Sequence, residues 1–432
     1  MKVILKNINL LNPEQGINEK GTDLVITDGK ITNMGKVPDT ESSEAKVYDF
    51  TGKYVVPGLF DMHVHLREPG REDEETVKTG CDSAAQGGFT GIACMPNTEP
   101  AIDSAEVVTL IKDKAAYHLV DVHPVGAATV GRKGEVISPM AELVEAGAVG
   151  FSDDGVAVKT SAMLRRSLEY AGMYNAPVIE HCEDESLTGG AMNEGINSTT
   201  LGLPPVPSVS EDIIVSRDLL MAEYTGGKIH IAHISTKKSV EMVREAKKKG
   251  IKVTAEVTPH HFTLTDDAVK TYDTNVKMSP PLRTQADVDA VHKGLKDGTI
   301  DCIASDHAPH SPEEKEAEFE FAPNGILGLE TQVGLALSEL YAKKVLTLEQ
   351  LVEKMSLNPR RILNIPIPRF EEGQTANLTI LDIDSVWTVD INKFKSKSHN
   401  SPFDKRLMTG KAVGVINKGR MYLADSGTFE II

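Results

Sequence analysis

Apolar and polar residues alternate along both ends of the chain. VILKNINLL near the start and ANLTILDID near the end show this pattern, and Gly21, Gly29 and the polar stretch Asp39–Glu44 mark turns within the first fifty residues. A period of two is typical of β-strands that bury one face. We therefore predict that residues 1–55 and 366–432 form one small composite β-sandwich domain, with the middle of the chain inserted between its halves.

The middle of the chain, residues 56–365, has a longer repeat. Short apolar runs rich in β-branched residues alternate with helical stretches at 104–117, 161–174, 210–224 and 237–249. Eight such runs occur, from VVPGLFDMHVH to DCIASDHAP, and this pattern favours a parallel sheet with crossover helices. We predict an α/β fold with a (β/α)8 TIM-type barrel, although a doubly wound sheet has the same local signal.

Composition and charge exclude several classes of function. The net charge of −17 argues against a nucleic-acid partner, because such binding relies on Lys and Arg that neutralise phosphates. No apolar run approaches the roughly 20 residues that span a bilayer, and the N-terminus lacks the apolar core of a signal peptide. Four scattered cysteines without a CxxC pair suit free thiols in a reducing compartment. We expect a cytoplasmic protein that contacts neither nucleic acid nor membrane.

Polar residues cluster where the predicted strands end. Most of the eight runs have His, Asp or Asn at or near their carboxyl end, and in a barrel these ends meet at one mouth. In the first run, His63 and His65 share a face, because residues two apart in a strand point the same way. The other candidates at this rim are Asp153, Asp154, His181, His233 and Asp306. A hydrogen-bonded structural role explains any single histidine equally well, but four histidines with acids on one rim favour a metal site.

Several segments resemble the signature sequences of the dihydroorotase family within the amidohydrolase superfamily. The two most specific are DMHVHLREPG (Asp61–Gly70) and ASDHAPHSPEEK (Ala304–Lys315). Between them stand, in the order of that family, MPNTEPAID, FSDDG, EHCED, AHIST and KMSPPLR. The flanking strands also resemble the composite β domain of the superfamily, so the likeness covers nearly the whole chain.

The resemblance implies a zinc site with one or two ions. The implied ligands are, for the more buried ion, His63, His65 and Asp306, and for the second ion, His181 and His233. Many relatives bridge the ions with a carboxylated lysine, but FSDDG offers aspartates and no lysine, like the bacterial dihydroorotase class that uses aspartate. The spacing to His181 favours Asp154 over Asp153 as this bridge.

Further positions are candidates for substrate binding. Arg67 follows the HxH pair on the same face, and a guanidinium can grip a carboxylate through two hydrogen bonds, although a surface ion pair is the alternative. By resemblance, Asn97 and His310 also contact the substrate. Ser279 stands where the family's KMNPPLR form has asparagine, and Asn324-Gly325 stands where Phe-Gly is more usual. Both of these positions are implied to contact the substrate ring.

The resemblance implies reversible cyclisation of N-carbamoyl-L-aspartate to L-dihydroorotate, a step of pyrimidine biosynthesis. A metal-activated water would attack the ring amide, and Asp306 would carry its proton to the departing nitrogen. We expect a homodimer, with aspartate transcarbamoylase as a candidate partner. One alternative is another cyclic amidohydrolase, an allantoinase or dihydropyrimidinase, against which the missing lysine and the HLREPG arginine argue. The other is a non-catalytic scaffold for aspartate transcarbamoylase, in which metal ligands are typically lost.

Overall fold

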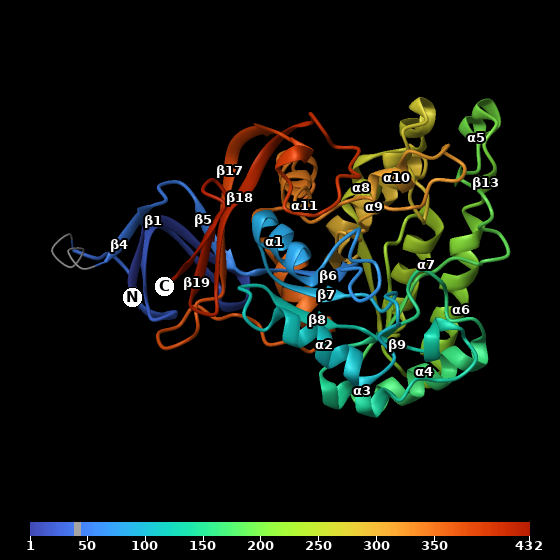
Figure 1. The fold of residues 1–432 in the computed structure, drawn as a ribbon, viewed down its shortest axis with the longest axis horizontal. Helices are drawn as coiled ribbons and strands as arrows, with labels where there is room; N and C mark the ends of the chain where they lie inside the picture. Colours follow the sequence, from blue (N-terminus) through green and yellow to red (C-terminus); the bar gives the residue numbers. More distant parts are fainter. Residues whose placement is uncertain (39–44) are drawn as a thin grey trace.

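The computed structural model describes residues 1–38 and 45–432, so the turn predicted at Asp39–Glu44 lies outside the described residues. Strands from the two ends of the chain lie side by side in one part of the molecule, blue and red at the left of Figure 1. The middle of the chain forms the helix-covered part at the right. The two chain ends therefore belong to one structural unit, away from the carboxyl ends of the inner strands.

This unit is built on a nine-stranded sheet of order β20-β19-β18-β17-β5-β1-β2-β3, with β4 paired to β1. The strands are β1 (Lys2–Asn12), β2 (Ile17–Thr27), β3 (Lys30–Met34), β4 (Lys46–Asp49), β5 (Tyr54–Pro57), β17 (Leu378–Thr388), β18 (Leu407–Asn417), β19 (Arg420–Leu423) and β20 (Thr428–Ile431). The antiparallel pair β5·β17 joins the two halves, with Pro57 opposite Leu378. The predicted limit at residue 55 falls within β5, and the exact domain limits stay a prediction.

Eight strand positions close a barrel, with β8 and β9 counted as one position. The inner strands are β6 (Leu59–Val64), β7 (Phe89–Cys94), β8 (Asp121–Pro124), β9 (Gly126–Ala127), β10 (Phe151–Ser152), β11 (Val178–Glu180), β14 (Ile229–Ile231), β15 (Val253–Val257) and β16 (Cys302–Ile303). They form the parallel sheets β6-β7-β8 and β16-β15-β14-β11-β10-β9. Only Val125 separates β8 from β9, and Val64 bridges His307 just after β16, so the sheets join at both ends. The predicted barrel is confirmed over the open doubly wound sheet.

Helices surround the inner strands. They are α1 (Val77–Gly87), α2 (Ala105–Ala115), α3 (Met140–Ala146), α4 (Ser161–Met173), α5 (Ile196–Leu201), α6 (Val209–Thr225), α7 (Lys237–Lys248), α8 (Pro259–Thr263), α9 (Gln285–Asp297), α10 (Pro312–Lys315), α11 (Gln332–Leu335), α12 (Leu348–Val352) and α13 (Asn358–Ile362). The short pair β12 (Met192–Asn193) and β13 (Pro205–Val206) lies among the loops. The four predicted helical stretches correspond to α2, α4, α6 and α7. Thr160 and Thr236 begin α4 and α7 by accepting a backbone N–H, the usual N-cap interaction.

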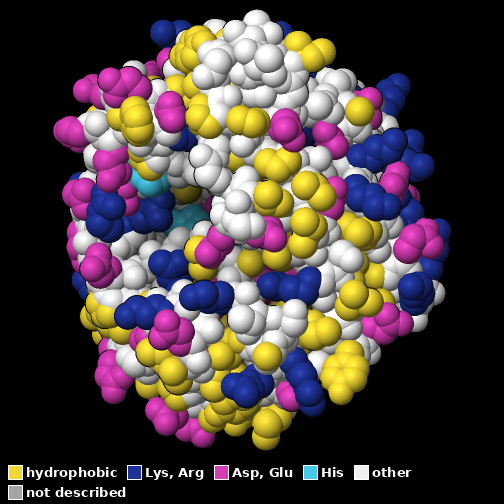
Figure 2. All heavy atoms as spheres, turned by 90° about the vertical axis from the view of Figure 1, so that its right-hand side faces the viewer, with side chains coloured by type: hydrophobic (Ala, Val, Ile, Leu, Met, Phe, Trp, Pro, Cys, Tyr) yellow, Lys and Arg dark blue, Asp and Glu magenta, His cyan; other side chains and the backbone are white. Residues whose placement is uncertain are grey.

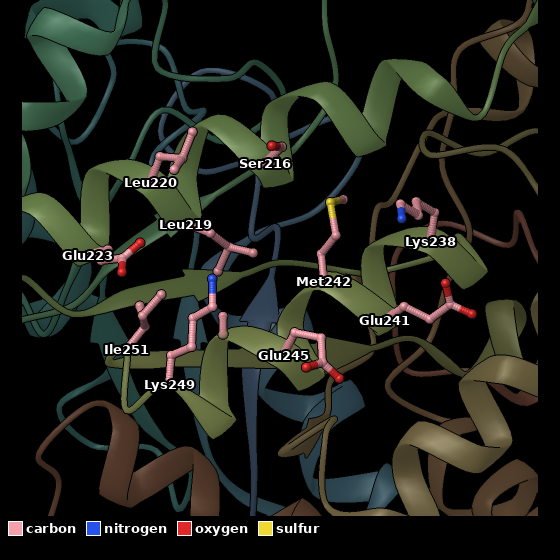
Figure 3. A pocket seen from close by; sticks show the side chains of 11 residues that line it. Ser216, Leu219, Leu220, Glu223, Lys238, Glu241, Met242, Glu245, Lys249 and Ile251 are labelled. Atoms are coloured by element: carbon pink, nitrogen blue, oxygen red, sulfur yellow. The ribbon is translucent and has the colours of Figure 1, made fainter.

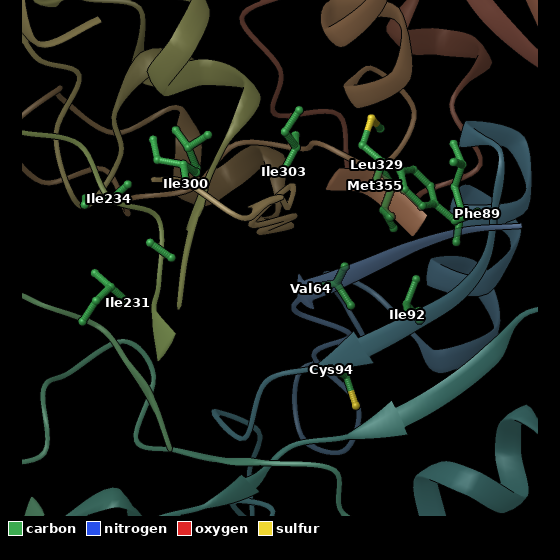
Figure 4. Close-up of a cluster of buried hydrophobic side chains, with 14 of the residues drawn as sticks. Val64, Phe89, Ile92, Cys94, Ile231, Ile234, Ile300, Ile303, Leu329 and Met355 are labelled. Atoms are coloured by element: carbon green, nitrogen blue, oxygen red, sulfur yellow. The ribbon is translucent and has the colours of Figure 1, made fainter. Parts of the chain in front are cut away.

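The barrel strands are largely apolar on both faces, as expected for buried parallel strands. Their outward side chains, among them Val64, Ile92 and Ile303, pack in one large buried cluster (Figure 4). Alternate residues such as Phe60 and Ala93 belong to a separate cluster that fills the interior. Because these layers hold the strands rigidly, the polar residues that follow each strand start from well-defined positions. Among the residues described, none of the helices is long and apolar enough to cross a bilayer.

Candidate metal centre

Four histidines and two aspartates meet at the carboxyl ends of the barrel strands. They come from β6, β10, β11, β14 and β16, and each is at most 7% exposed: His63, His65, Asp154, His181, His233 and Asp306. Figure 2 shows histidine side chains inside a hollow on this side of the molecule, next to basic side chains on its rim. Residues separated by up to 243 positions in the sequence (63 to 306) are thus brought into one buried cluster.

Asp154 lies at the centre of this cluster. Its Oδ1 is 3.4 Å from Nε2 of His63, 3.8 Å from Nε2 of His233 and 3.9 Å from Nδ1 of His181. Its Oδ2 is 3.6 Å from Nε2 of His65. One carboxylate therefore faces an imidazole nitrogen of every histidine in the set, which is the position that a bridging ligand between two ions requires.

Asp306 follows β16 and lies next to the two histidines of β6. Its Oδ1 is 2.9 Å from Nε2 of His65 and 3.4 Å from Nε2 of His63. Burial by itself would raise the pKa of Asp306, but the charge of His63 and the contact with His65 outweigh burial and hold the pKa well below its usual value. Asp306 is therefore a carboxylate at neutral pH and can accept a proton.

The unsatisfied polar atoms of the cluster fit a metal ion. His63 Nε2 and Asp154 Oδ1 are buried and have no hydrogen-bond partner, which is costly for polar groups unless another ligand satisfies them. Atoms that share one zinc lie roughly 3–4 Å apart, because each is about 2 Å from the ion. The distances around Asp154 fall in this range. Three overlapping triplets meet the requirement: His63–His65–Asp154, His63–His233–Asp306 and Asp154–His181–His233.

Local backbone geometry turns these side chains toward each other. The pairing of β6 with β7 shifts register between Asp61 and Val64, a β-bulge of the kind that re-aims side chains beside active sites. Asp61 stabilises the bulge by accepting the backbone N–H of His63 and of Ser305. Asp306 itself has a φ of 48°, a left-handed conformation that is rare outside glycine and concentrated at functional sites.

The neighbouring aspartate has a different environment. Asp153 accepts hydrogen bonds from the backbone N–H and the hydroxyl of Thr129, at 2.9 and 2.6 Å, and so serves the loop after β9. Asp154 alone of the FSDDG pair faces the histidines. This placement agrees with the preference for Asp154 that its spacing to His181 suggests.

Sequence reasoning missed two acids that orient the histidines. Glu256, on β15, accepts a hydrogen bond from Nδ1 of His63 at 2.6 Å and one from Nε2 of His230 at 3.2 Å. Although burial opposes ionisation, the charge of His63 and these hydrogen bonds lower the pKa of Glu256 to about 2. An isolated acid inside the apolar run KVTAEVTPH was the available signal.

The second missed acid is Glu183, which accepts from Nε2 of His181 at 3.1 Å. Burial again opposes ionisation, but the hydrogen bond and the charge of His181 lower the pKa of Glu183 to about 2. Ser279 donates its hydroxyl to the same carboxylate. The residue expected to contact the substrate ring is thus also connected to His181 through Glu183.

The remaining predicted substrate residues lie beside the cluster. Asn97 accepts a hydrogen bond from Nδ1 of His65 at 2.7 Å, so it orients that imidazole as well. His310 lies against Arg67, with Nη2 of Arg67 3.3 Å from Nε2 of His310. Asn324 offers its backbone carbonyl to His310 Nε2 at 2.9 Å. A Cβ on Gly325 would lie 2.7 Å from the His310 ring, so the glycine leaves room for the imidazole. Their substrate contacts stay predictions.

A separate groove of about 420 Å³ lies between α6 and α7 on the outside of the barrel (Figure 3). Leu219, Leu220, Met242 and Ile251 line it together with exposed acids and lysines. Its described lining contains no histidine. The groove therefore lacks the imidazole ligands of the metal cluster, and the candidate site is at the mouth of the barrel.

Sequence comparison links the chain to known proteins. A family model described as "Dihydro-orotase-like" matches residues 52–239. A dihydroorotase of Pelotomaculum thermopropionicum is 52% identical over 427 residues, which cover 98% of this chain and 99% of the relative. A dihydroorotase of Acetivibrio thermocellus is 48% identical over 425 residues, with 98% and 99% covered.

Solved structures share the whole architecture. L-Hydantoinase (dihydropyrimidinase) from Arthrobacter aurescens has a TM-score of 0.84 at 28% identity, and the match covers 97% of this chain and 95% of that one. Dihydropyrimidinase from Brevibacillus agri also has a TM-score of 0.84, at 22% identity, with 98% and 95% covered. At that identity the second likeness shows the fold alone.

We predict that Glu256→Gln weakens metal binding about 10- to 100-fold, because the amide loses the charge that holds and polarises His63. Metal affinity is measured by titration against a competing chelator. Glu241→Gln, an exposed acid on α7, is the matched control and should bind metal as the original protein does. Unchanged affinity in the Glu256 variant would show that its carboxylate does not support the ligand.

Proposed function

Because the chain belongs to the dihydroorotase family, we propose that its histidine–aspartate cluster binds zinc and uses it to open and close the ring of dihydroorotate. The protein is a cyclic amidohydrolase, as its relatives show. The observation that carries the proposal is the Asp154 carboxylate, which faces all four imidazoles within 3.9 Å. Imidazole and carboxylate ligands in this number suit zinc.

The cluster offers places for one or two ions. In our proposal His63, His65 and Asp306 hold the more buried ion. His181 and His233 hold the second, and Asp154 bridges the two. Aspartate in FSDDG fills the role for which many amidohydrolases use a carboxylated lysine.

In the proposed reaction Asp306 moves the proton. The metal, when bound, polarises the ring carbonyl and lowers the pKa of a water molecule. Asp306, ionised because of its low pKa, accepts the proton of the attacking water. It then donates this proton to the ring nitrogen as the C–N bond breaks, which yields N-carbamoyl-aspartate. In the direction of synthesis the same carboxyl group takes the proton from the carbamoyl nitrogen, and water leaves.

The substrate carboxylate is assigned to the cationic side of the mouth. Arg67 and His310 lie in contact there, and the charge of Arg67 interacts with those of Asp306 and Asp154. We propose that Arg67, His310 and Asn97 bind the carboxylate. The ring then lies against Ser279 and the Asn324-Gly325 segment.

We also propose a compartment and partners for the protein. All four cysteines are buried free thiols, which suits the reducing cytoplasm. A homodimer and an association with aspartate transcarbamoylase stay predictions. The non-catalytic scaffold is disfavoured because the described site has a full set of candidate ligands.

We predict that chelation abolishes reversible dihydroorotate hydrolysis and that zinc restores it. Metal analysis should find one or two zinc ions per chain in the active protein. Full activity in protein shown to be free of metal would contradict the zinc proposal.

We predict that Asp306→Ala lowers kcat by at least about 100-fold, the scale of general acid–base catalysis, while the fold is retained. Steady-state kinetics and circular dichroism measure the two effects. Residual activity close to the original level would exclude Asp306 as the proton carrier.

We predict that Arg67→Ala raises KM for dihydroorotate about 10- to 100-fold, the range for a lost hydrogen bond to a charged group, with a smaller effect on kcat. Dihydroorotate, allantoin and dihydrouracil are assayed side by side with the original protein and the variant. A preference of the original protein for either uncharged ring would favour the alternative cyclic amidohydrolases.

A further inference from the structure

A buried acid that the reaction does not use lies behind the proposed carboxylate site. Glu74, in the segment between β6 and α1, is 1% exposed. Its Oε2 is 3.2 Å from Nε of Arg67, and its Oε1 is 2.9 Å from Nδ1 of His310. Glu314, on α10, approaches the same Nδ1 at 3.1 Å from the outer side. Two acids thus contact the two side chains proposed to bind the substrate anion.

The charges around these acids argue against a second metal site. Glu74, His310 and Glu314 are close enough to surround an ion. However, Nη2 of Arg71 lies 3.2 Å from Glu74 Oε1 and 2.7 Å from Glu314 Oε1. A guanidinium therefore already pairs with both carboxylates, in the place that a metal ion would need. The two acids form ion pairs or hydrogen bonds with Arg67, Arg71 and His310, so they do not require a metal ion as a partner.

The acids determine which nitrogen of His310 carries a proton. An unprotonated Nδ1 would point its lone pair at carboxylate oxygens of both Glu74 and Glu314, so Nδ1 must donate. Nε2 is then the edge of the ring that lies toward Arg67 and the carbonyl of Asn324. Glu74 and Glu314 therefore keep a proton on Nδ1 and hold the imidazole in one orientation.

The same carboxylate restricts the guanidinium. Arg67 donates Nε to Pro309 O at 3.0 Å, and Glu74 faces that nitrogen as well. Among the described residues, no hydrogen-bond partner is found for Nη1 of Arg67. One end of the guanidinium is thus held from behind, while donors at the other end remain for a ligand.

We propose that Glu74, with Glu314, positions Arg67 and His310 as a preformed receptor for a ring that bears a carboxylate. This inference rests on the proposed function, because it assigns the substrate anion to those two side chains. Glu74 and Glu314 touch neither the substrate nor the metal. They act by removing the conformational freedom that binding would otherwise have to restrict.

Two explanations of Glu74 predict opposite effects of its neutralisation on the binding of an anion. If Glu74 contributed only charge, its neutralisation would make the mouth more positive and strengthen binding of an anion. If it positions the two donors, its neutralisation weakens binding in spite of the added positive charge. We expect Glu74→Gln to raise KM for dihydroorotate about 10-fold or more, the lower end of effects seen for supporting residues, with kcat and zinc content nearly unchanged.

A double-mutant cycle with Arg67→Ala tests whether Glu74 acts through the guanidinium. Glu74→Gln should raise the KM of the Arg67→Ala variant by a smaller factor than it raises that of the original protein, because one of the two groups that it orients is gone. Equal losses of kcat and stability in both backgrounds would indicate a merely structural acid and overturn the proposal. Glu313→Gln, an exposed acid beside Glu314, removes the same charge without these contacts and should behave as the original protein does.

Glu314→Gln provides the second variant, since its carboxylate is 35% exposed and its loss is better tolerated by the fold. It should raise KM by a smaller factor. An unchanged or lower KM in both acid variants would overturn the inference. If Arg67→Ala itself leaves KM unchanged, the proposed function fails at that residue. If Arg67→Ala raises KM and the acid variants do not, only the role of Glu74 and Glu314 fails.

Discussion

The Asp154 carboxylate is the centre on which the arrangement of the site depends. Its two oxygens lie 3.4 to 3.9 Å from imidazole nitrogens that come from three different strand ends. Such a cluster of buried polar groups is stable only where a rigid frame holds its members and a further ligand satisfies them. The closed barrel supplies the frame, because the carboxyl ends of all its strands meet at one mouth.

The acids behind the histidines make the cluster specific. Glu256 contacts His63, Glu183 contacts His181, and the amide of Asn97 contacts His65. Each partner determines which ring nitrogen carries the proton, and thereby which nitrogen faces Asp154. The β-bulge at Asp61 and the left-handed backbone of Asp306 show that the local backbone conformation also orients these side chains.

Charge is organised on a larger scale around the mouth. The chain carries a net charge of −17, which by itself would repel an anionic substrate. Arg67 and Arg71 form a local cationic cluster beside His310, and Glu74 and Glu314 hold it in place. The acids reduce its net charge but define the direction of its donors. In our proposal a carboxylate is recognised at this position by geometry more than by long-range attraction.

The sequence alone indicated the barrel, the shared strands of the two chain ends and the residue types at the mouth. Periodicity is a local property, so eight apolar runs and the HxH pair could be recognised before any contact was known. The spacing between FSDDG and His181 was likewise enough to prefer Asp154. In contrast, Glu256 lies 193 positions from His63, and Glu74 lies 236 positions from His310. Such pairs exist only once the barrel closes and the loops pack. Tertiary structure therefore decided which acids support the histidines and the guanidinium, because hydrogen-bond partners across a closed barrel leave no periodic trace in the chain.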